Sequence, residues 1–161
     1  MNRGRKKFLQ RAGLFLAAAF CLLQFFRPEK NLSSPTSFDL FAIHPAPPEV
    51  KQLLTVACYD CHSNHTRYPW YAEIQPLGWW LAQHVRDGKQ ELNFSEFGSL
   101  SAKRAKNKLE ACIDELEAKN MPLPSYTIAH RDARLSEAQR QTLTAWLEEV
   151  LERVEANSAA P

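Results

Sequence analysis

Apolar residues recur along the chain at the spacing of one face of an α-helix. Four segments repeat this spacing, with apolar positions three or four residues apart, as in amphipathic helices that pack on a core. The four stripes are Val50, Leu53, Leu54 and Ala57; Leu77, Trp80, Leu81, His84 and Val85; Ala105, Leu109, Cys112, Ile113 and Leu116; and Leu143, Trp146, Leu147, Val150, Leu151 and Val154. No segment shows the period of two that is typical of a strand. The pattern therefore predicts an all-α protein with about four helices in the body of the chain.

Local residues indicate where these helices begin and end. Pro48 can occupy a first helical turn, and Ser136 with Gln139 three residues later forms a capping box. Ser101 can cap the third helix, and Gly88 offers a stop for the second. The connecting segments are predicted to be loops, at residues 63–76, 89–100 and 120–135.

The first 26 residues have a pattern of their own. Basic residues in the sequence RGRKK lead into an uncharged apolar run of 15 residues, at 12–26. This pattern is typical of an export signal, although the run is shorter than the roughly 20 residues that span a bilayer comfortably. No small residues mark a cleavage site after the run, which favours an uncleaved signal anchor. The prediction is a single-pass protein of the bacterial cytoplasmic membrane, with everything after Phe26 on the outer, periplasmic side.

Composition and charge divide the rest of the chain. Residues 27–48 contain five prolines and no sustained periodicity, so they are predicted to be a tether. Residues 49–155 form the predicted domain, and 156–161 a C-terminal tail. Basic residues are concentrated ahead of the first acidic residue, Glu29, so the body is mildly acidic although the formal net charge is +2. A mildly acidic body argues against a nucleic-acid-binding protein, which needs a basic face.

Two cysteines and a histidine stand together in the sequence ACYDCH. Cys58, Cys61 and His62 have the spacing C-x-x-C-H, which is the attachment signature of c-type haem. Two thiols three residues apart can form thioethers with the two vinyl groups of one porphyrin. The next residue can then present its imidazole to the iron as the proximal ligand. Such attachment takes place outside the cytoplasm, which agrees with the predicted export signal.

Two other interpretations of this motif stay open. A structural zinc site would need four ligands, and no second C-x-x-C or H-x-x-x-H pair is present to complete it. An exported C-x-x-C could also belong to a thiol–disulfide oxidoreductase. That chemistry usually lies on a βαβ scaffold, which the helical pattern does not provide. Haem attachment is therefore the favoured interpretation.

A haem iron with two protein ligands needs a second residue on its distal side. Met121 is the only methionine besides the initiator, and Pro122 and Pro124 stiffen the segment around it. We expect Met121 to be the distal iron ligand. His84, on the apolar face of the second predicted helix, is the alternative distal ligand, although a histidine in such a position is more often a core residue.

Several stretches of the chain resemble one known family: QFFRPEKN, HPAPPEV, ACYDCHSNHTRYPWY, PLGWWLAQHV, LNFSEFG and MPLPSYTIAHRDARLS. The body from about His44 to Leu151, together with QFFRPEKN ahead of it, is similar in order and spacing to the bacterial haem-binding domain of membrane-tethered c-type cytochromes. The resemblance implies a cytochrome c-like bundle around one covalent haem per chain. It also implies thioethers at Cys58 and Cys61 and proximal ligation by His62. Met121 matches the family's Met-Pro position, which supports it as the distal ligand.

The expected function is electron transfer by a membrane-anchored, outward-facing monohaem c-type cytochrome. Two protein ligands on the iron would leave little room for a substrate, and no recognisable acid–base set accompanies the motif, so an enzyme is less favoured. The alternative is a haem-based gas or redox sensor, or a haem enzyme subunit, with one axial position open. The expected partners are a redox protein and the membrane, and not nucleic acid.

Overall fold

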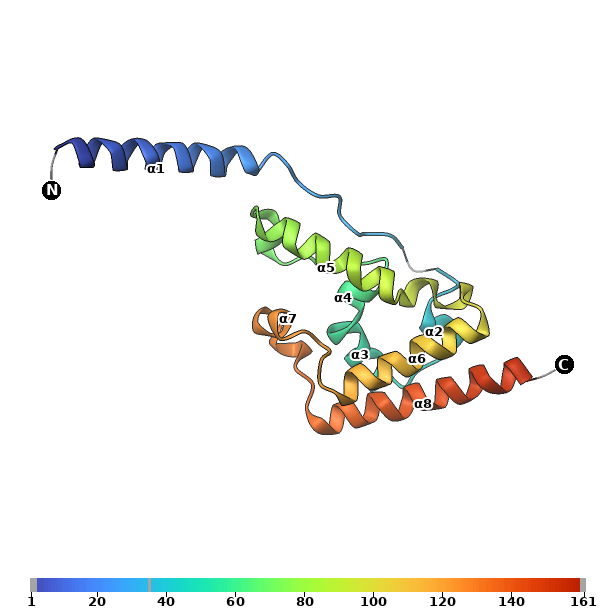
Figure 1. Cartoon of the computed structure of the whole chain (residues 1–161). Helices are drawn as coiled ribbons and strands as arrows, with labels where there is room; N and C mark the ends of the chain where they lie inside the picture. Colours follow the sequence, from blue (N-terminus) through green and yellow to red (C-terminus); the bar gives the residue numbers. More distant parts are fainter. Residues whose placement is uncertain (1–2, 35, 160–161) are drawn as a thin grey trace. The chain divides into compact units, whose positions relative to one another are not determined.

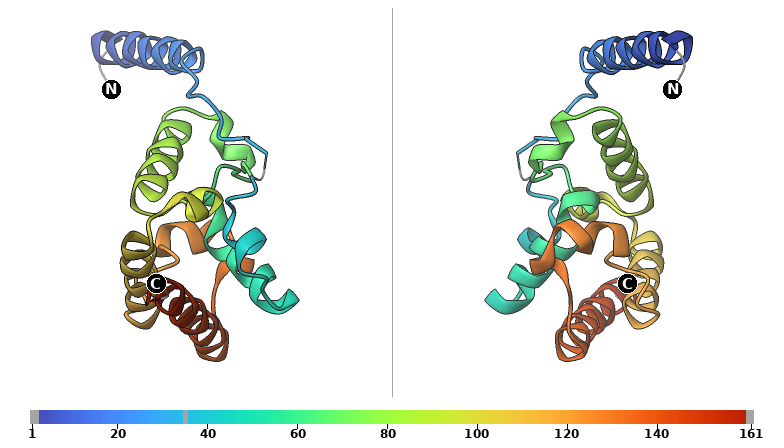
Figure 2. Two further views of the ribbon diagram at one scale, coloured as in Figure 1. Left: turned by 90° about the vertical axis from the view of Figure 1, so that its right-hand side faces the viewer. Right: turned by 90° about the vertical axis from the view of Figure 1, so that its left-hand side faces the viewer.

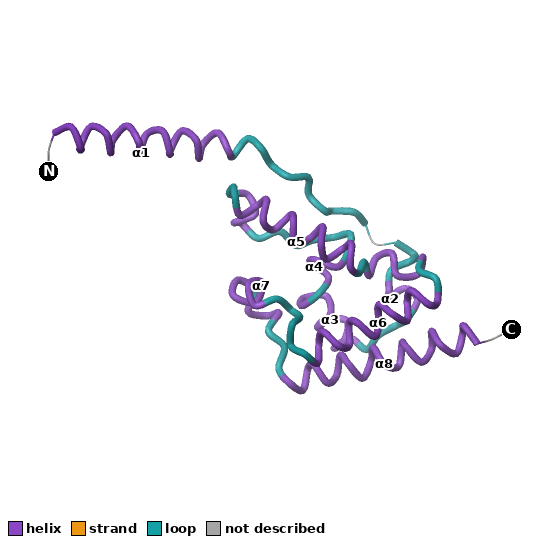
Figure 3. Tube along the Cα trace, viewed as in Figure 1, coloured by secondary structure: helices purple, strands orange, loops and turns teal. Residues whose placement is uncertain are grey.

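The computed structural model describes residues 3–34 and 36–159. These residues form helices joined by loops and turns, and no strand is present among them (Figure 1, Figure 3). A bridge between Leu32 and His65 is the one isolated β-type contact in this part of the chain. The described residues are therefore all-helical, as the hydrophobic pattern predicted.

The prediction of about four helices is wrong. The described residues form eight α-helices and three 3-10 helices. The elements are α1 Arg3–Leu23, α2 Leu40–Ile43, α3 Pro48–Ala57, α4 Tyr59–His62, η1 Trp70–Glu73, α5 Leu77–Glu91, η2 Phe94–Ser99, α6 Ala102–Glu117, α7 Pro124–Ala129, η3 Arg131–Ala133 and α8 Glu137–Ala159. The additional α-helices α2, α4 and α7 have four to six residues. Segments this short contain too few positions for a helical period to be recognised in the sequence.

The predicted N-terminal membrane anchor is also wrong. Within the described part of the chain, no helix combines the length and the apolar character that crossing a bilayer requires. α1 has five basic residues in its first half and ends at Leu23, so its longest uncharged run covers residues 12–23. At about 1.5 Å per residue these cover about 18 Å, whereas the hydrocarbon core of a bilayer is about 30 Å thick. The single-pass membrane localisation, which depended on this anchor, is therefore wrong as well.

The chain divides into two compact units. Unit 1 comprises Met1–Lys30 and Arg67–His84, and unit 2 comprises Asn31–Thr66 and Val85–Pro161. α5 therefore begins in unit 1 and ends in unit 2. The segments of unit 1 are far apart in sequence, so contacts between their side chains hold the unit together.

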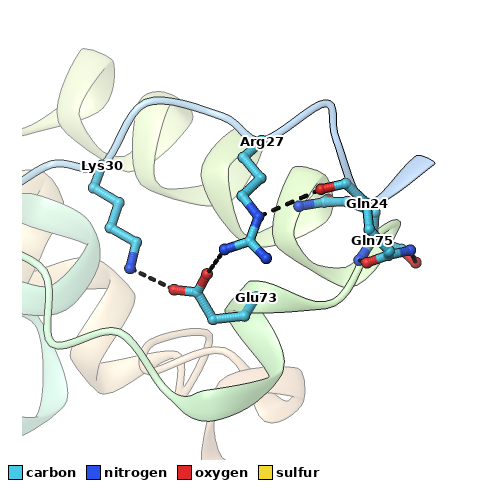
Figure 4. A network of polar contacts seen from close by, with 5 residues as sticks. All are labelled: Gln24, Arg27, Lys30, Glu73 and Gln75. Atoms are coloured by element: carbon cyan, nitrogen blue, oxygen red, sulfur yellow. Dashed lines mark hydrogen bonds and ion pairs between the residues drawn. The ribbon is translucent and has the colours of Figure 1, made fainter. Parts of the chain in front are cut away.

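Polar contacts join the two segments of unit 1 (Figure 4). The Glu73 carboxylate accepts hydrogen bonds from both Arg27 and Lys30. The side chain of Gln24 exchanges two hydrogen bonds with the backbone of Gln75: Gln24 Nε2 donates to the Gln75 carbonyl at 3.2 Å, and the Gln75 N–H donates to Gln24 Oε1 at 2.8 Å. The chain that leaves α1 is thereby bonded to the region between η1 and α5.

Unit 2 contains the hydrophobic core. α6 and α8 run antiparallel, side by side (Figure 1, Figure 2), and α3 packs against α8. Six of the most completely buried core residues come from these three helices, namely Leu54, Leu109, Leu116, Leu143, Leu147 and Val150, and Leu40 of α2 and Phe94 of η2 are buried with them. Three of the four predicted apolar stripes therefore meet in one core.

Two helix boundaries test the predicted start and stop signals. At the start of α8 the capping box is confirmed, because the Ser136 N–H donates to Gln139 Oε1 at 2.9 Å and the Gln139 N–H donates to Ser136 Oγ at 3.2 Å. The predicted stop at Gly88 is wrong, because α5 continues to Glu91. A Cβ on Gly88 would lie 2.7 Å from the carbonyl oxygen of Cys61. Gly88 therefore permits close approach of α5 to the Cys61 backbone instead of ending the helix.

Candidate functional site

A cavity of about 320 Å³ opens in unit 2, beside the C-x-x-C-H segment. Its volume is within the range of about 300–1,000 Å³ that small-molecule and cofactor sites occupy. Its lining residues include Cys58, His62, Leu92, Phe94, Cys112 and Met121. The cavity thus brings together side chains from α4, η2, α6 and the segment after α6.

The backbone around Cys58 determines which side chains of the motif face the cavity. Cys58 ends α3 and precedes α4, and its N–H donates to the Leu54 carbonyl at 2.9 Å. Its own carbonyl accepts from the N–H of His62 at 3.0 Å, which closes one helical turn. Residues four apart lie on the same side of a helix. Cys58 and His62 accordingly both line the cavity.

Cys61 has different surroundings from Cys58. Its backbone and Cβ lie against Gly88 of α5, where an added Cβ would be 3.1 Å from the Cβ of Cys61. Cys61 is partly buried, is not in a disulfide, and is not among the residues that line the cavity. The structure therefore places two of the three motif residues on the cavity wall and the third beside it.

The imidazole of His62 has a defined orientation. Its Nδ1 lies 3.1 Å from the carbonyl oxygen of Leu92. A carbonyl oxygen can only accept, so Nδ1 carries the hydrogen and Nε2 of the neutral ring carries the lone pair. Burial lowers the pKa of His62, and the backbone carbonyls of Leu92 and Gly88 oppose this effect. A partly buried neutral imidazole with a carbonyl behind Nδ1 is the usual arrangement of a metal-ligating histidine.

A row of aromatic rings supports the segment that carries His62. Phe41 stacks on Tyr59 with ring centroids 5.0 Å apart, and Tyr59 stacks on Phe94 at 5.1 Å. The edge of the His62 ring then meets Phe94, at 6.2 Å and an interplanar angle of 63°. Phe94 is almost completely buried. The imidazole is therefore held by packing as well as by its hydrogen bond.

Met121 lies on the same cavity although it is far from His62 in the sequence. α6 ends at Glu117, and Lys119 takes a left-handed conformation with φ of 61°, which turns the chain. The N–H of Met121 then donates to the Glu115 carbonyl at 3.2 Å. Its side chain is partly buried and lines the cavity. The fold thus brings the two predicted axial ligands to one site.

The alternative distal ligand, His84, has local contacts on α5. It is on α5 within unit 1, where its ring packs against Trp80 with centroids 4.2 Å apart. Its Nδ1 lies 2.9 Å from the Trp80 carbonyl oxygen, one turn earlier in the helix. His84 is not among the residues that line the cavity. Both contacts of its ring are local to α5.

The thiols near the cavity are protonated at neutral pH. Burial raises the pKa of Cys61 to about 11, with a further contribution from Asp60, and raises that of Cys112 to about 12, with a contribution from Glu115. Burial likewise raises the pKa of Cys58. A structural zinc site needs four ligands in one place. In the ranges 3–34 and 36–159, no three His, Cys, Asp or Glu side chains are grouped in a way that could hold a metal ion.

Sequence reasoning missed two residues of the site. Cys112 belongs to the apolar stripe predicted for the third helix, and it also lines the cavity one helical turn before Leu116. The carbonyl of Leu92 orients His62, and this role cannot be predicted from the sequence because every residue has a backbone carbonyl.

Comparison with known families identifies the family of the chain. The haem-binding domain family matches residues 18–149, which is most of the chain. The chain belongs to the haem-binding domain family. Comparison with curated proteins and with solved structures finds no match.

The residues of the cavity fit a haem group. A porphyrin is a large apolar slab, and apolar side chains such as Leu92 and Phe94 make up much of the lining. Histidine nitrogen and methionine sulfur are both known ligands of haem iron, and His62 and Met121 offer one of each. Cys58 adds a protonated thiol on the same wall. This haem-binding chain therefore has one cavity in which these groups converge within the described residues.

Proposed function

We propose that the chain is a monohaem c-type cytochrome that transfers electrons. The observation that carries this proposal is that Cys58, His62 and Met121 line one cavity although Met121 is far from the other two in sequence. In the proposal Cys58 and Cys61 attach the haem, His62 is the proximal ligand and Met121 the distal one. Haem iron supplies a one-electron couple between the ferric and the ferrous state.

The two cysteines provide covalent attachment in this proposal. Each thioether forms when a Cys S–H adds across a vinyl C=C, so that the sulfur bonds one carbon and the hydrogen goes to the other. The addition needs no oxidant and has no leaving group. Cys58 lines the cavity, and Cys61 follows within the same helical turn, beside it. Attachment would keep the cofactor on the chain through many cycles of oxidation and reduction.

The axial ligands favour an electron carrier over a catalyst or a sensor. With His62 and Met121 both bound, the iron has no coordination position for a substrate or a gas. Such an iron can still exchange electrons with a redox partner protein, because electron exchange needs no open coordination position. A haem sensor or a haem enzyme subunit would instead need one of these positions to be open.

Thioether attachment can be tested one cysteine at a time. Acid–acetone extraction should leave haem on the wild-type chain, and replacement of both Cys58 and Cys61 by Ser should release it. Each single variant should keep the haem through one thioether. Its pyridine haemochrome band should then lie at longer wavelength, because one vinyl group stays conjugated with the porphyrin.

Cys112→Ser and Cys21→Ser are the matched controls, and both should behave as wild type. Cys112 is the informative one, since it also lines the cavity. Complete release of haem from the wild-type chain would refute covalent attachment. Carbon monoxide should not bind the reduced wild-type protein, and rapid binding would favour the sensor or the enzyme subunit instead.

A further inference from the structure

The segment that carries Met121 is bonded at its beginning to α8. Arg140, in the first turns of α8, donates from Nη1 to two carbonyl oxygens, those of Leu116 at 3.1 Å and of Met121 at 2.6 Å. Leu116 lies in the last turn of α6, where helical carbonyls need partners from outside the helix. One guanidinium therefore ties the end of α6 to the backbone of Met121 itself. Hydrogen bonds from a charged donor are about twice as strong as neutral ones.

The same segment is bonded at its other end to the C-x-x-C-H motif. Tyr126 lies in α7, five residues after Met121, and its hydroxyl is 2.6 Å from Asp60 Oδ2. It is also 3.0 Å from the Val56 carbonyl oxygen. The hydroxyl has one hydrogen, and the shorter contact to the carboxylate takes it. Asp60 lies between Cys58 and Cys61 and is only 5% exposed, so this contact joins the proximal segment to the distal one.

We propose that Arg140 and Tyr126 are positioning residues for the distal iron ligand. They hold the chain from Lys119 to Tyr126 so that the thioether of Met121 stays on the cavity. The inference rests on the proposed function in one respect, namely that Met121 binds the iron.

A physical argument links these contacts to ligation. A thioether is a neutral ligand with a weaker bond than an imidazole, and Met121 lies in a segment between helices that would otherwise be mobile. Bonds that order the segment in advance remove the conformational entropy that ligation would otherwise cost. The charge of Arg140 also reaches the cavity wall, since it opposes the rise that burial causes in the pKa of Cys58.

The experiment compares Arg140→Gln and Tyr126→Phe with the wild-type holoprotein. The far-red sulfur-to-iron charge-transfer band of the ferric protein reports the bound thioether, and carbon monoxide binding to the ferrous protein reports its absence. Each variant should increase the fraction of molecules without bound Met121 by about tenfold, the effect of losing one hydrogen bond to a charged group. Arg140→Lys should restore most of the band, because an ammonium can also donate to two carbonyls.

Arg153→Gln is the matched control, since it removes an arginine from the exposed face of the same helix. It should keep the wild-type band. Acid–acetone extraction confirms that each variant carries its haem. If Arg140→Gln fails to fold, Tyr126→Phe carries the test, because it removes a single oxygen atom.

The outcomes separate the inference from the function on which it rests. If the wild-type protein shows the band and both variants keep it at full intensity and exclude carbon monoxide, Arg140 and Tyr126 are not positioning residues. If the wild-type protein lacks the band, Met121 is not the ligand and the inference is overturned with that assignment.

Discussion

Replacing Phe94 by alanine tests whether the aromatic row beneath His62 is packed as the structure describes. The Phe94 side chain is 1% exposed, stacks on Tyr59 and meets the edge of His62. Its deletion would remove a buried ring and enlarge the cavity that it lines. Both effects destabilise the folded state, since the remaining side chains cannot close the space completely.

The expected cost follows from these contacts. Deletion of a buried phenylalanine costs about 3–5 kcal/mol, and the ring–ring contacts place Phe94 in the upper part of that range, at about 4 kcal/mol. Phe94→Leu keeps a branched apolar side chain and loses mainly the ring contacts, so it should cost about 1.5 kcal/mol. With a urea slope of about 2 kcal/mol per molar, the two midpoints should fall by about 2 M and about 0.7 M.

Urea titration of the haem-loaded protein, followed by far-UV circular dichroism, measures these shifts. Ile128→Ala is the control, because Ile128 is 73% exposed and its deletion should leave the midpoint unchanged. A fall of less than about 0.5 M for Phe94→Ala would contradict the packing described here, since a buried ring cannot be removed at so small a cost.

Two further predictions concern other residues of the site. Met121→Ala should abolish the far-red charge-transfer band and let carbon monoxide bind the reduced iron. His84→Ala should leave the band and the exclusion of carbon monoxide unchanged, because His84 packs against Trp80. Loss of the band in His84→Ala alone would make His84 the ligand. Burial raises the pKa of Cys112 from 9.0 to about 12, so above pH 9 the unfolded chain loses a proton that the folded chain keeps. The stability from this thiol is complete below pH 9, and the free energy of unfolding should then fall by about 1.4 kcal/mol per pH unit as pH rises toward about 12. Urea titrations between pH about 8 and about 10.5 should show that Cys112→Ala lacks this part of the decline. Cys21→Ala, a change at an exposed cysteine, should keep it. If the free energy of unfolding falls equally with pH in both variants, Cys112 is not buried as a thiol.

Local patterns were sufficient for the long helices of the core. The stripes of α3, α6 and α8 predicted which faces are buried, because a helix that packs on a core repeats its apolar residues every three or four positions. The capping box at Ser136 was equally visible, since both of its hydrogen bonds connect residues three positions apart. The C-x-x-C-H spacing likewise pointed to haem, and the family match supports haem binding.

Predictions from local patterns failed where the structure at a residue depends on contacts or helix limits outside the pattern. Glycine is common at the ends of helices, yet α5 continues through Gly88, where the Cys61 backbone lies close to the helix. The N-terminal run was interpreted as an anchor from its order of charged and apolar residues. Its uncharged helical part is too short to cross a bilayer, because the basic residues and the end at Leu23 limit it.

The sequence by itself determined the buried faces of α3, α6 and α8, the capping box at the start of α8 and the C-x-x-C-H spacing, because each depends on neighbours within one or two turns. Only the tertiary structure decided that Met121 shares a cavity with His62, that the Leu92 carbonyl orients the imidazole, and that Arg140 and Tyr126 bond the segment between them. These contacts join residues from about 20 to more than 60 positions apart, or use backbone groups that every residue possesses. Their positions are set by the packing of α3, α6 and α8 on one another, which no local period encodes.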